Sequence, residues 1–574
     1  MRWLVGSPAG EDTMSRTVGA ARILKRFLIA AALLVTALPP RARADDYYDP
    51  PGRVARLKYL RGPVSFQPAG DSDWVAAVVN RPLTTGDRLW TDSGARAELS
   101  IGSATIRLGP GTGFSFLNLD DGTVQVELTQ GTLGIRVRRL DRDEIFEVDT
   151  PNQAFTILRP GQYRFDASED GYTTFATVRR GEGEATGGGE IYPVHSGETG
   201  RFTGTDRLGA EVIDAGAPDE FDRWGWRRDR REDESRSARY VSRDVVGFED
   251  LDDYGTWRRD PEYGNVWFPT RVALGWAPYR EGHWVWVAPW GWTWVDDQPW
   301  GYAPFHYGRW LYVGGRWGWV PGPIAVRPVY APALVAFIGG PGISVSVSAG
   351  DTVGWFPLGP REVYVPAYTV SPTYVTRVNV SSTTVSSTTV INVYNSQVRN
   401  DYRSTSITYV NRAVPGGVTA VPHRAFVSAQ PVARAAVPLN AQQASSGPVG
   451  ARAAVAPTRE SVLGAQASTV GRAARPPAGI ATRPVVAKAP PPPPPVPFAR
   501  QQEALAAHPG QPLVRQEVER LRPAPADRAP AHPLIRQAPP ARPVSPETRG
   551  PPGQPDAGRP GRPTAQPGDQ PRPG

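Results

Sequence analysis

Residues 282–296 read GHWVWVAPWGWTWVD, in which two runs of alternating tryptophan and smaller residues flank a short break. Trp284 and Trp286 lie two positions apart, as do Trp292 and Trp294, and a period of two places such side chains on one face of a β-strand. The Gly-x-Trp steps supply the tight turns that a hairpin needs. The stretch therefore predicts a small β-hairpin whose indole rings share one face.

The same pattern recurs about every 26 residues. Twelve of the 18 tryptophans lie between Trp257 and Trp319. Three units begin alike, at Tyr254–Trp257, Glu281–Trp284 and Tyr307–Trp310. The repeat predicts three hairpins in one tryptophan-rich module. A module this small needs nearly all its rings buried, or a neighbour to dock against, because the entropy lost in ordering the chain opposes folding.

The tryptophan rings suit two roles, and the sequence leaves both open. They form a hydrophobic core, which we favour, or an exposed subset stacks on the apolar face of a sugar and forms a glycan platform. In the second role, polar residues beside the rings hydrogen bond to sugar hydroxyls. The candidate platform residues are Trp284, Trp286, Trp292, Trp294, Trp310, His283 and His306.

Polar residues within the repeat offer little catalytic chemistry. His283 and His306 occupy related places, but no third ligand recurs with them, so a metal site is disfavoured. Asp296 and Asp297 are adjacent, and a strand would point them to opposite faces rather than toward one substrate. We expect this pair to lie in a solvated turn.

The composition argues against an enzyme. The chain has no cysteine and only 6 histidines, which are scattered. No nucleophile-elbow, zinc-binding or phosphate-loop pattern occurs in the sequence. We therefore expect no catalytic residue, no cofactor and no metal ion. An envelope hydrolase with a serine site that lacks a local motif is kept as a second alternative.

Upstream of the repeat, from Arg56 to about Gly216, short apolar runs alternate with Gly, Asp and Asn. The runs have a period of two, which predicts strands. Asp121-Gly122 and Asp170-Gly171 favour tight hairpins with positive φ at both central positions. An all-β domain is expected at 45–216.

This domain resembles the FecR domain over roughly Arg56 to Arg201. Family members usually show Val-x-Gly-Thr where this chain has Leu158-Arg159-Pro160-Gly161, which predicts a modified final sheet. The resemblance implies a secreted β scaffold that binds a protein or a glycan. It rests on the order and spacing of Gly62-Pro63-Val64, Gly86-Asp87, Thr91, Gly94, Leu108, Pro110, Gly131 and Phe146–Pro151.

The resemblance does not carry over a signalling role. FecR proteins of iron signalling place a cytoplasmic anti-sigma domain before a membrane span. Only 26 residues precede Phe27 here, too few for such a domain.

The tryptophan-rich part resembles a Trp- and Tyr-rich proteobacterial family of unknown function that often follows a FecR domain. The motif that carries this resemblance is Pro304–Trp310, PFHYGRW, and the likeness runs on to Tyr330-Ala331-Pro332. That family has no assigned activity. The resemblance therefore implies an envelope location and an architecture, and no catalytic residue.

The amino terminus has the form of a secretory signal. Basic residues between Arg16 and Arg26 precede the largely apolar run 27–38, and Ala44 and Asp45 flank the expected cleavage site. Twelve residues form a helix of roughly 18 Å, shorter than the roughly 30 Å of a bilayer core, so a retained anchor is the weaker alternative. We assign 1–44 to the signal, with translation starting at Met14, and expect a periplasmic or secreted protein of a Gram-negative bacterium.

The rest of the chain divides by composition. We expect a charged linker at 217–249, the tryptophan-rich domain and its β extension at 250–411, and an extended conformation for the Ser/Thr-rich run 378–393. No Tyr or Trp follows Tyr409, and 490–495 are six consecutive prolines. A disordered, proline-rich and basic tail is therefore expected at 412–574.

Together these features predict a mainly β protein with a FecR-like all-β domain, a tryptophan-rich module of short hairpins and a long disordered Pro/Ala/Arg-rich tail. The expected function is a non-enzymatic interaction or scaffold protein of the cell envelope, with cell-wall glycan binding as the alternative. The expected partner is an envelope protein or a cell-wall glycan, and not nucleic acid, because the chain is exported. After signal cleavage we expect no membrane span.

Overall fold

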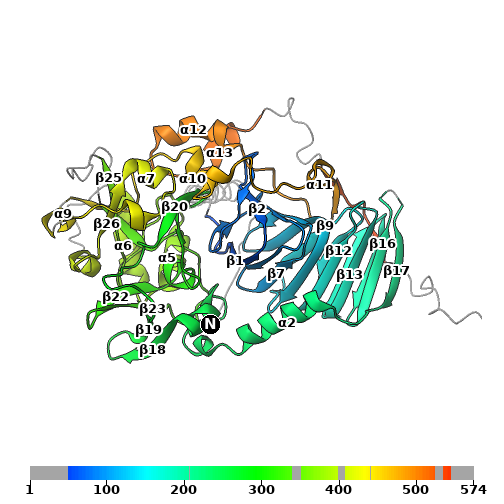
Figure 1. Cartoon of the computed structure of the whole chain (residues 1–574), viewed down its shortest axis with the longest axis horizontal. Coiled ribbons are helices and arrows are strands. Elements are labelled where there is room, and N and C mark those ends of the chain that lie inside the picture. The colour runs from blue at the N-terminus through cyan, green and yellow to red at the C-terminus, as the bar shows by residue number, and fades with distance from the viewer. Residues whose placement is uncertain are drawn as a thin grey trace, which may run out of the picture. The chain divides into compact units, whose positions relative to one another are not determined.

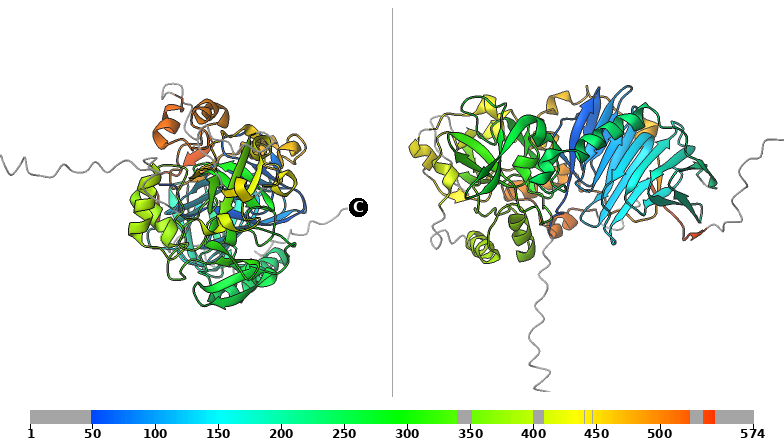
Figure 2. Two further views of the ribbon diagram at one scale, coloured as in Figure 1. Left: turned by 90° about the vertical axis from the view of Figure 1, so that its left-hand side faces the viewer. Right: turned by 90° about the horizontal axis from the view of Figure 1, so that it is seen from below.

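The protein is mainly β, as predicted, and its strands gather in two neighbouring domains (Figures 1 and 2). The computed structural model describes residues 49–205, 207–338, 351–398, 408–439, 441–445, 447–523 and 534–543. The predicted signal, with Met14, Ala44 and Asp45, lies outside these residues. Every described residue from Pro50 onward belongs to one compact unit. No helix in the described ranges is long and apolar enough to cross a bilayer.

The first domain contains strands β1 to β17, which follow the alternating apolar runs of the sequence. Their bounds are β1 (Ala55–Arg61), β2 (Val64–Gln67), β3 (Val75–Ala76), β4 (Pro82–Leu83), β5 (Arg88–Thr91), β6 (Arg96–Ser100), β7 (Ala104–Leu108), β8 (Thr112–Leu119), β9 (Thr123–Val137), β10 (Ile145–Asp149), β11 (Ala154–Ile157), β12 (Gly161–Ala167), β13 (Thr173–Arg180), β14 (Glu182–Gly187), β15 (Glu190–His195), β16 (Glu198–Thr203) and β17 (Gly209–Asp214).

These strands form two sheets that share β9. Sheet A has the order β4-β1-β6-β7-β9-β12-β13-β16-β17. Sheet B has the order β3-β2-β5-β8-β9-β10-β11-β14-β15 and ends on the short late strand β30 (Arg542–Pro543). The β9–β10 and β15–β30 pairs are parallel, and the other pairs named here are antiparallel. The strand passes from sheet B to sheet A at Gly131, where φ is +93°. A Cβ atom there would lie 2.4 Å from Thr112 Oγ1, so this corner requires glycine.

The alternation along each strand decides which side chains enter the core between the two sheets. In β9, Val124, Val126 and Leu128 are buried in this core. Gln125 and Glu127 lie on the opposite, outer face of sheet B, because successive side chains of a strand point to opposite faces. Other segments of the chain cover part of each outer face, and these contacts position the candidate sites described below.

The hairpins predicted at Asp121-Gly122 and Asp170-Gly171 are present as β8–β9 and β12–β13. Their turns differ from the prediction, because neither aspartate adopts a positive φ. In the first turn, Asp120 Oδ1 accepts hydrogen bonds from the backbone N–H groups of residues 122 and 123, each at 2.8 Å. The side chain of Asp120 therefore closes this turn.

The second domain contains the three predicted tryptophan hairpins, which are confirmed as β18–β19, β20–β21 and β22–β23. The first and third join in a four-stranded sheet through the pair Trp267 and Trp319, and the second forms a two-stranded sheet. A further sheet has the order β26-β25-β24-β27. The bounds are β18 (Gly255–Asp260), β19 (Gly264–Pro269), β20 (Gly282–Val287), β21 (Gly291–Asp296), β22 (Arg309–Val313), β23 (Arg316–Val320), β24 (Val335–Ile338), β25 (Thr352–Pro357), β26 (Thr419–Pro422) and β27 (Val449–Gly450).

Helices and short strands fill the remaining described ranges. The helices are α2 (Glu220–Asp233), η1 (Arg236–Arg239), η2 (Phe248–Asp250), α3 (Leu251–Tyr254), α4 (Ala303–His306), α5 (Pro372–Val380), α6 (Ser387–Val398), η3 (Val410–Ala413), α7 (His423–Val427), α8 (Val432–Ala435), α9 (Ala441–Ser445), α10 (Arg459–Leu463), η4 (Ala467–Thr469), α11 (Ala478–Ala481), α12 (Phe498–Ala507) and α13 (Arg515–Arg520). The late strands are β28 (Val485–Ala487), β29 (Ile535–Gln537) and β30 (Arg542–Pro543).

The segment 217–249, predicted as a charged linker, joins the two domains and contains the helix α2, which lies along sheet A (Figure 1). Asp219 caps the helix by accepting a hydrogen bond from Asp222 N at 2.9 Å. Phe221 and Trp224 are buried, and the ring of Trp224 lies 5.8 Å from that of Tyr59 on β1. The many charges of this segment suggested a solvated chain. The two aromatic residues three positions apart explain why it packs on the sheet instead.

The Ser/Thr-rich run 378–393 is not extended, since α5 and α6 occupy most of it. Ser371 Oγ accepts a hydrogen bond from Tyr374 N at 3.0 Å, and Ser386 Oγ accepts one from Thr389 N at 3.1 Å. These serines cap the two helices. The extended prediction followed the β-branched residues and overlooked the capping serines.

Within the segment 412–574, predicted as a tail, the structure describes short elements as far as residue 523 and again within 534–543. Strand β26 pairs with β25, and Phe426 on α7 is buried beside the rings of Trp284 and Trp292. From 451 to 523 the chain runs across both domains in short elements. Residues 524–533 and 544–574 lie outside the described ranges.

Candidate functional site

The five candidate platform tryptophans are buried. Trp284, Trp294 and Trp310 are at most 1% exposed, and Trp286 and Trp292 are 6% exposed. The rings whose centroids lie 5.3 to 5.5 Å from that of Trp284 belong to Trp294, Trp355, Phe337 and Phe426. The rings therefore serve as core, and a glycan platform at these positions does not fit the structure because none of them offers a flat face to a sugar.

The two candidate histidines are buried as well, at 4% exposure for His283 and 0% for His306. His306 Nδ1 lies 2.8 Å from Ala331 O, and its ring stacks on Tyr330. Burial lowers the pKa of His306 to about 3, so this side chain is neutral near pH 7. Among the described residues no three His, Asp or Glu side chains are grouped as metal ligands would be.

Asp296 and Asp297 do not share a solvated turn, because only Asp297 is exposed. Asp296 is 2% exposed, whereas the side chain of Asp297 is 56% exposed. Trp294 Nε1 and Gln298 N each donate to Asp296 at 3.0 Å. Burial raises the pKa of Asp296 well above its usual range. This carboxyl therefore supports the chain locally, without a partner for acid–base chemistry.

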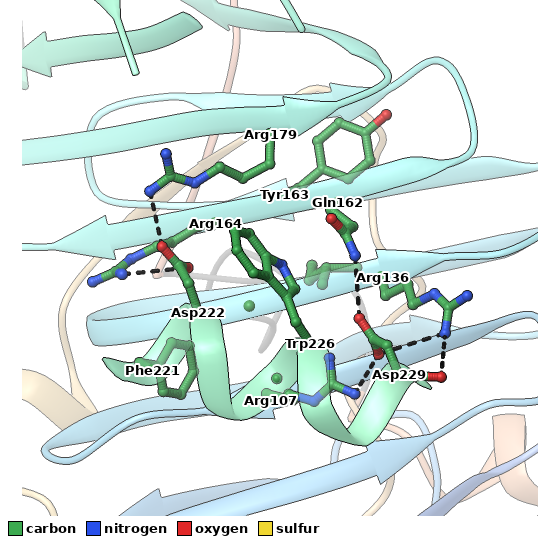
Figure 3. A pocket seen from close by; sticks show the side chains of 13 residues that line it. Arg107, Arg136, Gln162, Tyr163, Arg164, Arg179, Phe221, Asp222, Trp226 and Asp229 are labelled. Carbon is green, nitrogen blue, oxygen red and sulfur yellow. Dashed lines mark hydrogen bonds and ion pairs between the residues drawn. The ribbon is translucent and has the colours of Figure 1, made fainter. Parts of the chain in front are cut away.

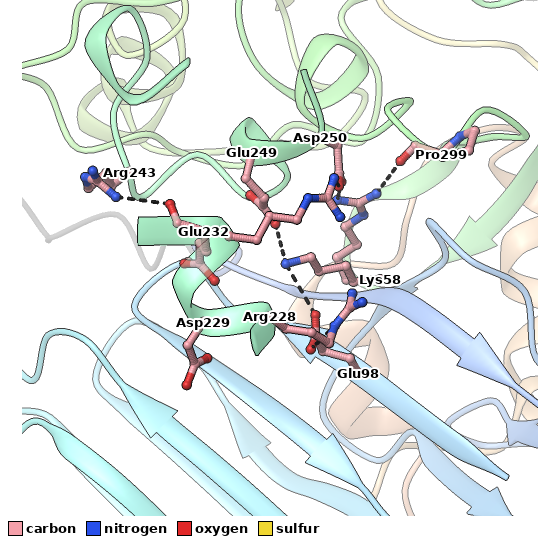
Figure 4. A network of polar contacts seen from close by, with 12 residues as sticks. Lys58, Glu98, Arg228, Asp229, Glu232, Arg243, Glu249, Asp250 and Pro299 are labelled. Atoms are coloured by element: carbon pink, nitrogen blue, oxygen red, sulfur yellow. Dashed lines mark hydrogen bonds and ion pairs between the residues drawn. The ribbon is translucent and has the colours of Figure 1, made fainter. Parts of the chain in front are cut away.

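A cluster of charged residues that the sequence reasoning missed joins the two domains (Figure 4). At its centre, Lys58 on β1 forms ion pairs with Glu249 of η2 and, at 3.3 Å, with Glu98 on β6. The carboxylate of Glu98 also accepts hydrogen bonds from Arg107 Nε at 2.8 Å and from Arg228 Nε at 2.6 Å. Lys58, Glu98 and Glu249 are each at most 6% exposed at the side chain.

The charges in this cluster hold one another ionised. Burial alone would lower the pKa of Lys58, but Glu249 and Glu98 raise it above its usual range. Burial alone would raise the pKa of Glu98, but Lys58, Arg107 and Arg228 hold it well below its usual range. Each group therefore stays charged near pH 7, and removal of one would leave its partners buried and unpaired.

A second set of contacts binds η2 and the loop that follows β21 to the first domain. Arg56 Nη1 pairs with Asp250 Oδ2 at 2.6 Å. Asn80 Nδ2 donates to the backbone oxygens of Asp296 and Gln298, at 2.9 and 2.7 Å. Asn80 has φ +65°, in the left-handed region that asparagine tolerates better than most residues. The first domain thus binds the tryptophan-rich domain through an ion pair and through side-chain hydrogen bonds to backbone oxygens.

Beneath α2, sheet A presents a row of arginines from four neighbouring strands, toward which Asp222 and Asp229 of the helix point (Figure 3). Asp229 pairs with Arg107 at 2.6 Å and with Arg136 at 3.6 Å. Asp222 pairs with Arg164 at 3.4 Å and with Arg179 at 2.8 Å. The row consists of Arg107 on β7, Arg136 on β9, Arg164 on β12 and Arg179 on β13.

A cavity of about 30 Å³ remains between α2 and these arginines. It has room for a water molecule, whereas small-molecule sites usually measure roughly 300 to 1,000 Å³. This face therefore binds the acidic side chains that α2 directs toward it, and α2 fills the space. Alternation of Arg56 and Lys58 in β1 was the sequence signal that could have indicated such a charged outer face.

Sheet A continues beyond α2 to β16 and β17, and this end carries exposed apolar side chains. Phe175 on β13 is 36% exposed and Ile213 on β17 is 44% exposed. The register pairs Phe175 through Arg201 to Glu211, two residues before Ile213, so both apolar side chains share the face that carries the arginine row. In the described part of the chain β17 pairs only with β16, which leaves its outer edge open.

The fold and these contacts define a mainly β protein of two domains held together by buried charges. Residues 248–362, which span the three tryptophan hairpins and β24 to β25, match DUF6600, a family of unknown function. No curated protein matches the chain.

Two crystal structures of a "putative anti-sigma factor" from Parabacteroides distasonis are similar to part of the chain, at 16% and 15% identity. The alignment covers 23% of this chain and 60% of that one, with a TM-score of 0.21 in each case. This likeness is too slight to carry an argument about fold or function.

Proposed function

We propose that this protein is a non-enzymatic scaffold of the bacterial cell envelope, which is exported by its amino-terminal signal and binds a partner protein through its FecR-like first domain. The observation that carries the proposal is the uncovered end of sheet A, where Phe175 and Ile213 are exposed beside the open edge of β17. Exposed apolar side chains at an open sheet edge are typical of surfaces that pair with another chain.

The buried charge cluster supports the scaffold part of the proposal. Lys58, Glu98 and Glu249 link the two domains through groups that are desolvated and mutually paired. Such a junction favours one fixed arrangement of the domains, because any displacement would expose or unpair a buried charge. The proposed partner surface on sheet A is then presented by a rigid body.

Photo-crosslinking tests the proposed surface. A photoreactive amino acid is placed at position 175 or 213 of the full chain, expressed with its own signal in a Gram-negative host, and a third variant carries it at the fully exposed Leu274 of the second domain. We expect positions 175 and 213 to capture the same envelope protein, and position 274 not to capture it. Capture of unrelated abundant proteins at all three positions would refute the surface.

The same strains test the compartment. Fractionation should place the mature chain in the periplasm or the medium, with its first residue at Asp45. A chain that retains residues 1–44 in the cytoplasm would refute export.

A further inference from the structure

The outer face of sheet B carries a row of polar side chains that are buried although they point away from the domain core. Gln125 on β9 pairs in register with Glu147 on β10, and Glu127 pairs with Asp149. All four side chains are at most 6% exposed. What covers them is the carboxy-terminal part of the chain, from β28 into the proline run.

The covering segment is held through its backbone. Glu147 Oε1 accepts hydrogen bonds from Lys488 N and Ala489 N, each at 2.9 Å, and Gln125 Nε2 donates to Ala489 O at 2.8 Å. Two residues earlier, Val486 N donates to Thr150 O at 2.9 Å. Contacts of this kind recognise an extended chain by its peptide groups rather than by its side chains.

Two glycines allow the proline run to approach the first domain closely. A Cβ atom on Gly86 would lie 2.6 Å from Pro495 Cγ, and one on Gly70 would lie 2.8 Å from Val496 O. The segment is fixed again at its far end, where Phe498 N donates to Gly70 O at 3.1 Å. Residues 488–498 are therefore bound at both ends, with the six prolines between.

The prolines do not fill the space beneath them. A cavity of about 350 Å³ lies between the proline run and the strands, and Phe116, Glu127, Arg88 and Ser115 are among its lining residues. The groove is thus larger than the segment that occupies it. Its size lies within the range of sites that take a separate ligand.

We propose that this face of sheet B is a recognition groove for extended, proline-rich segments, and that residues 488–498 of a second copy of the chain bind in it. The segment is chemically suited to such an exchange. Consecutive prolines are already extended, so binding costs little conformational entropy. The flanking Lys488 meets an acidic surface, where its Nζ lies 2.7 Å from Glu184 Oε1.

The chain's own segment competes with the second copy. A tethered segment has a high effective concentration, on the order of millimolar, so binding between copies is expected only when the protein is concentrated. Exchange of an identical element between two copies creates no new contact and leaves every hydrogen bond described above intact. The result would be linked copies of a scaffold, which goes beyond the proposed binding of a partner protein.

The absence of cysteine makes the exchange measurable. Gln67 and Pro494 line the same cavity from the groove and from the segment. One full-length variant carries Gln67→Cys, a second carries Pro494→Cys, and the two are mixed at high concentration and treated with a short bismaleimide. A crosslink between Gln67→Cys and Pro494→Cys in this mixture can only join two copies. A single chain that carries both Gln67→Cys and Pro494→Cys reports whether the groove is occupied by the chain's own segment.

We expect a crosslinked heterodimer in the mixture, and much less when Pro494→Cys is replaced by Leu274→Cys, which lies on an exposed loop of the second domain. An excess of the free peptide KAPPPPPPVPF should suppress the heterodimer.

A heterodimer yield equal to that of the Leu274→Cys mixture, or one that the peptide does not lower, would overturn the proposal. An intrachain crosslink in the double variant under the same conditions would show that the protein had folded with its groove filled. No other protein is present, so this outcome is independent of whether the chain binds an envelope partner.

Discussion

Replacement of Lys58 by methionine tests whether the buried charges hold the two domains together. The change keeps the length of the side chain and removes its charge, so Glu249 is left buried without its ion-pair partner. Glu98 keeps Arg107 and Arg228. Removing one member of a buried pair typically costs about 3 to 5 kcal/mol, and we expect a loss in this range in the free energy of unfolding.

The control is an ion pair of similar length that lies in solvent. Arg159 pairs with Glu182 at 2.6 Å, but its side chain is 71% exposed. Arg159→Met should therefore cost at most about 1 kcal/mol. The double variant Lys58→Met with Glu249→Met should recover most of the loss, because an apolar pair of similar volume replaces the ion pair without leaving a buried charge.

Urea unfolding followed by tryptophan fluorescence measures these differences. Because 13 of the 18 tryptophans lie in the second domain, the signal reports that domain in particular. A loss for Lys58→Met no larger than that for Arg159→Met, or a double variant as unstable as Lys58→Met alone, would refute the view that this cluster fixes the domain junction.

Three further outcomes follow from the structure. Burial raises the pKa of Asp87 to about 6, against Arg81, from about 4 in the unfolded chain, so the folded chain takes up this proton more readily. Stability should therefore fall by about 2 kcal/mol from pH 4 to pH 6, and Asp87→Asn should remove that slope in urea titrations across this range. A Cβ atom on Gly301 would lie 2.2 Å from Asp296 Oδ1, so Gly301→Ala should lower the unfolding midpoint, whereas Gly216→Ala, with open space around it, should leave the midpoint unchanged. Trp284→Ala should cost about 3 to 5 kcal/mol because it empties the centre of a ring cluster, and titration of cell-wall oligosaccharides should leave the fluorescence of the unmodified chain unchanged.

The hairpins could be predicted because they depend on local information. Alternation placed Trp284 with Trp286 and Trp292 with Trp294, and the turn glycines separated the strands. The same alternation says only which rings share a face. What covers that face includes Phe426, more than 130 residues away along the chain, and local pattern does not contain this contact. The sequence therefore allowed two roles for the tryptophan rings, a hydrophobic core or a glycan platform, and could not decide between them.

The charge cluster escaped prediction for a related reason. Charged residues in a strand or a linker usually face water, and the sequence of α2 is dominated by Arg, Asp and Glu. Their burial follows from pairing between segments nearly 200 residues apart, such as Arg56 with Asp250. Phe221 and Trp224, three positions apart beside the cap at Asp219, were the local signal that a packed helix starts here.

The size of the tryptophan repeat explains why the segment beyond it folds at all. A module of about 66 residues must order its whole backbone, and the entropy this costs leaves little margin if any ring stays in water. The core that contains the repeat accordingly reaches from Val54 to Leu505 and takes in Phe426 and Phe498, residues from a region poor in aromatic side chains. That region lacks the apolar surface to fold alone, but its few large side chains pack into the core that contains the tryptophan repeat. The proline-rich carboxy-terminal segment is therefore held where the β domains offer contacts, and its order depends on them.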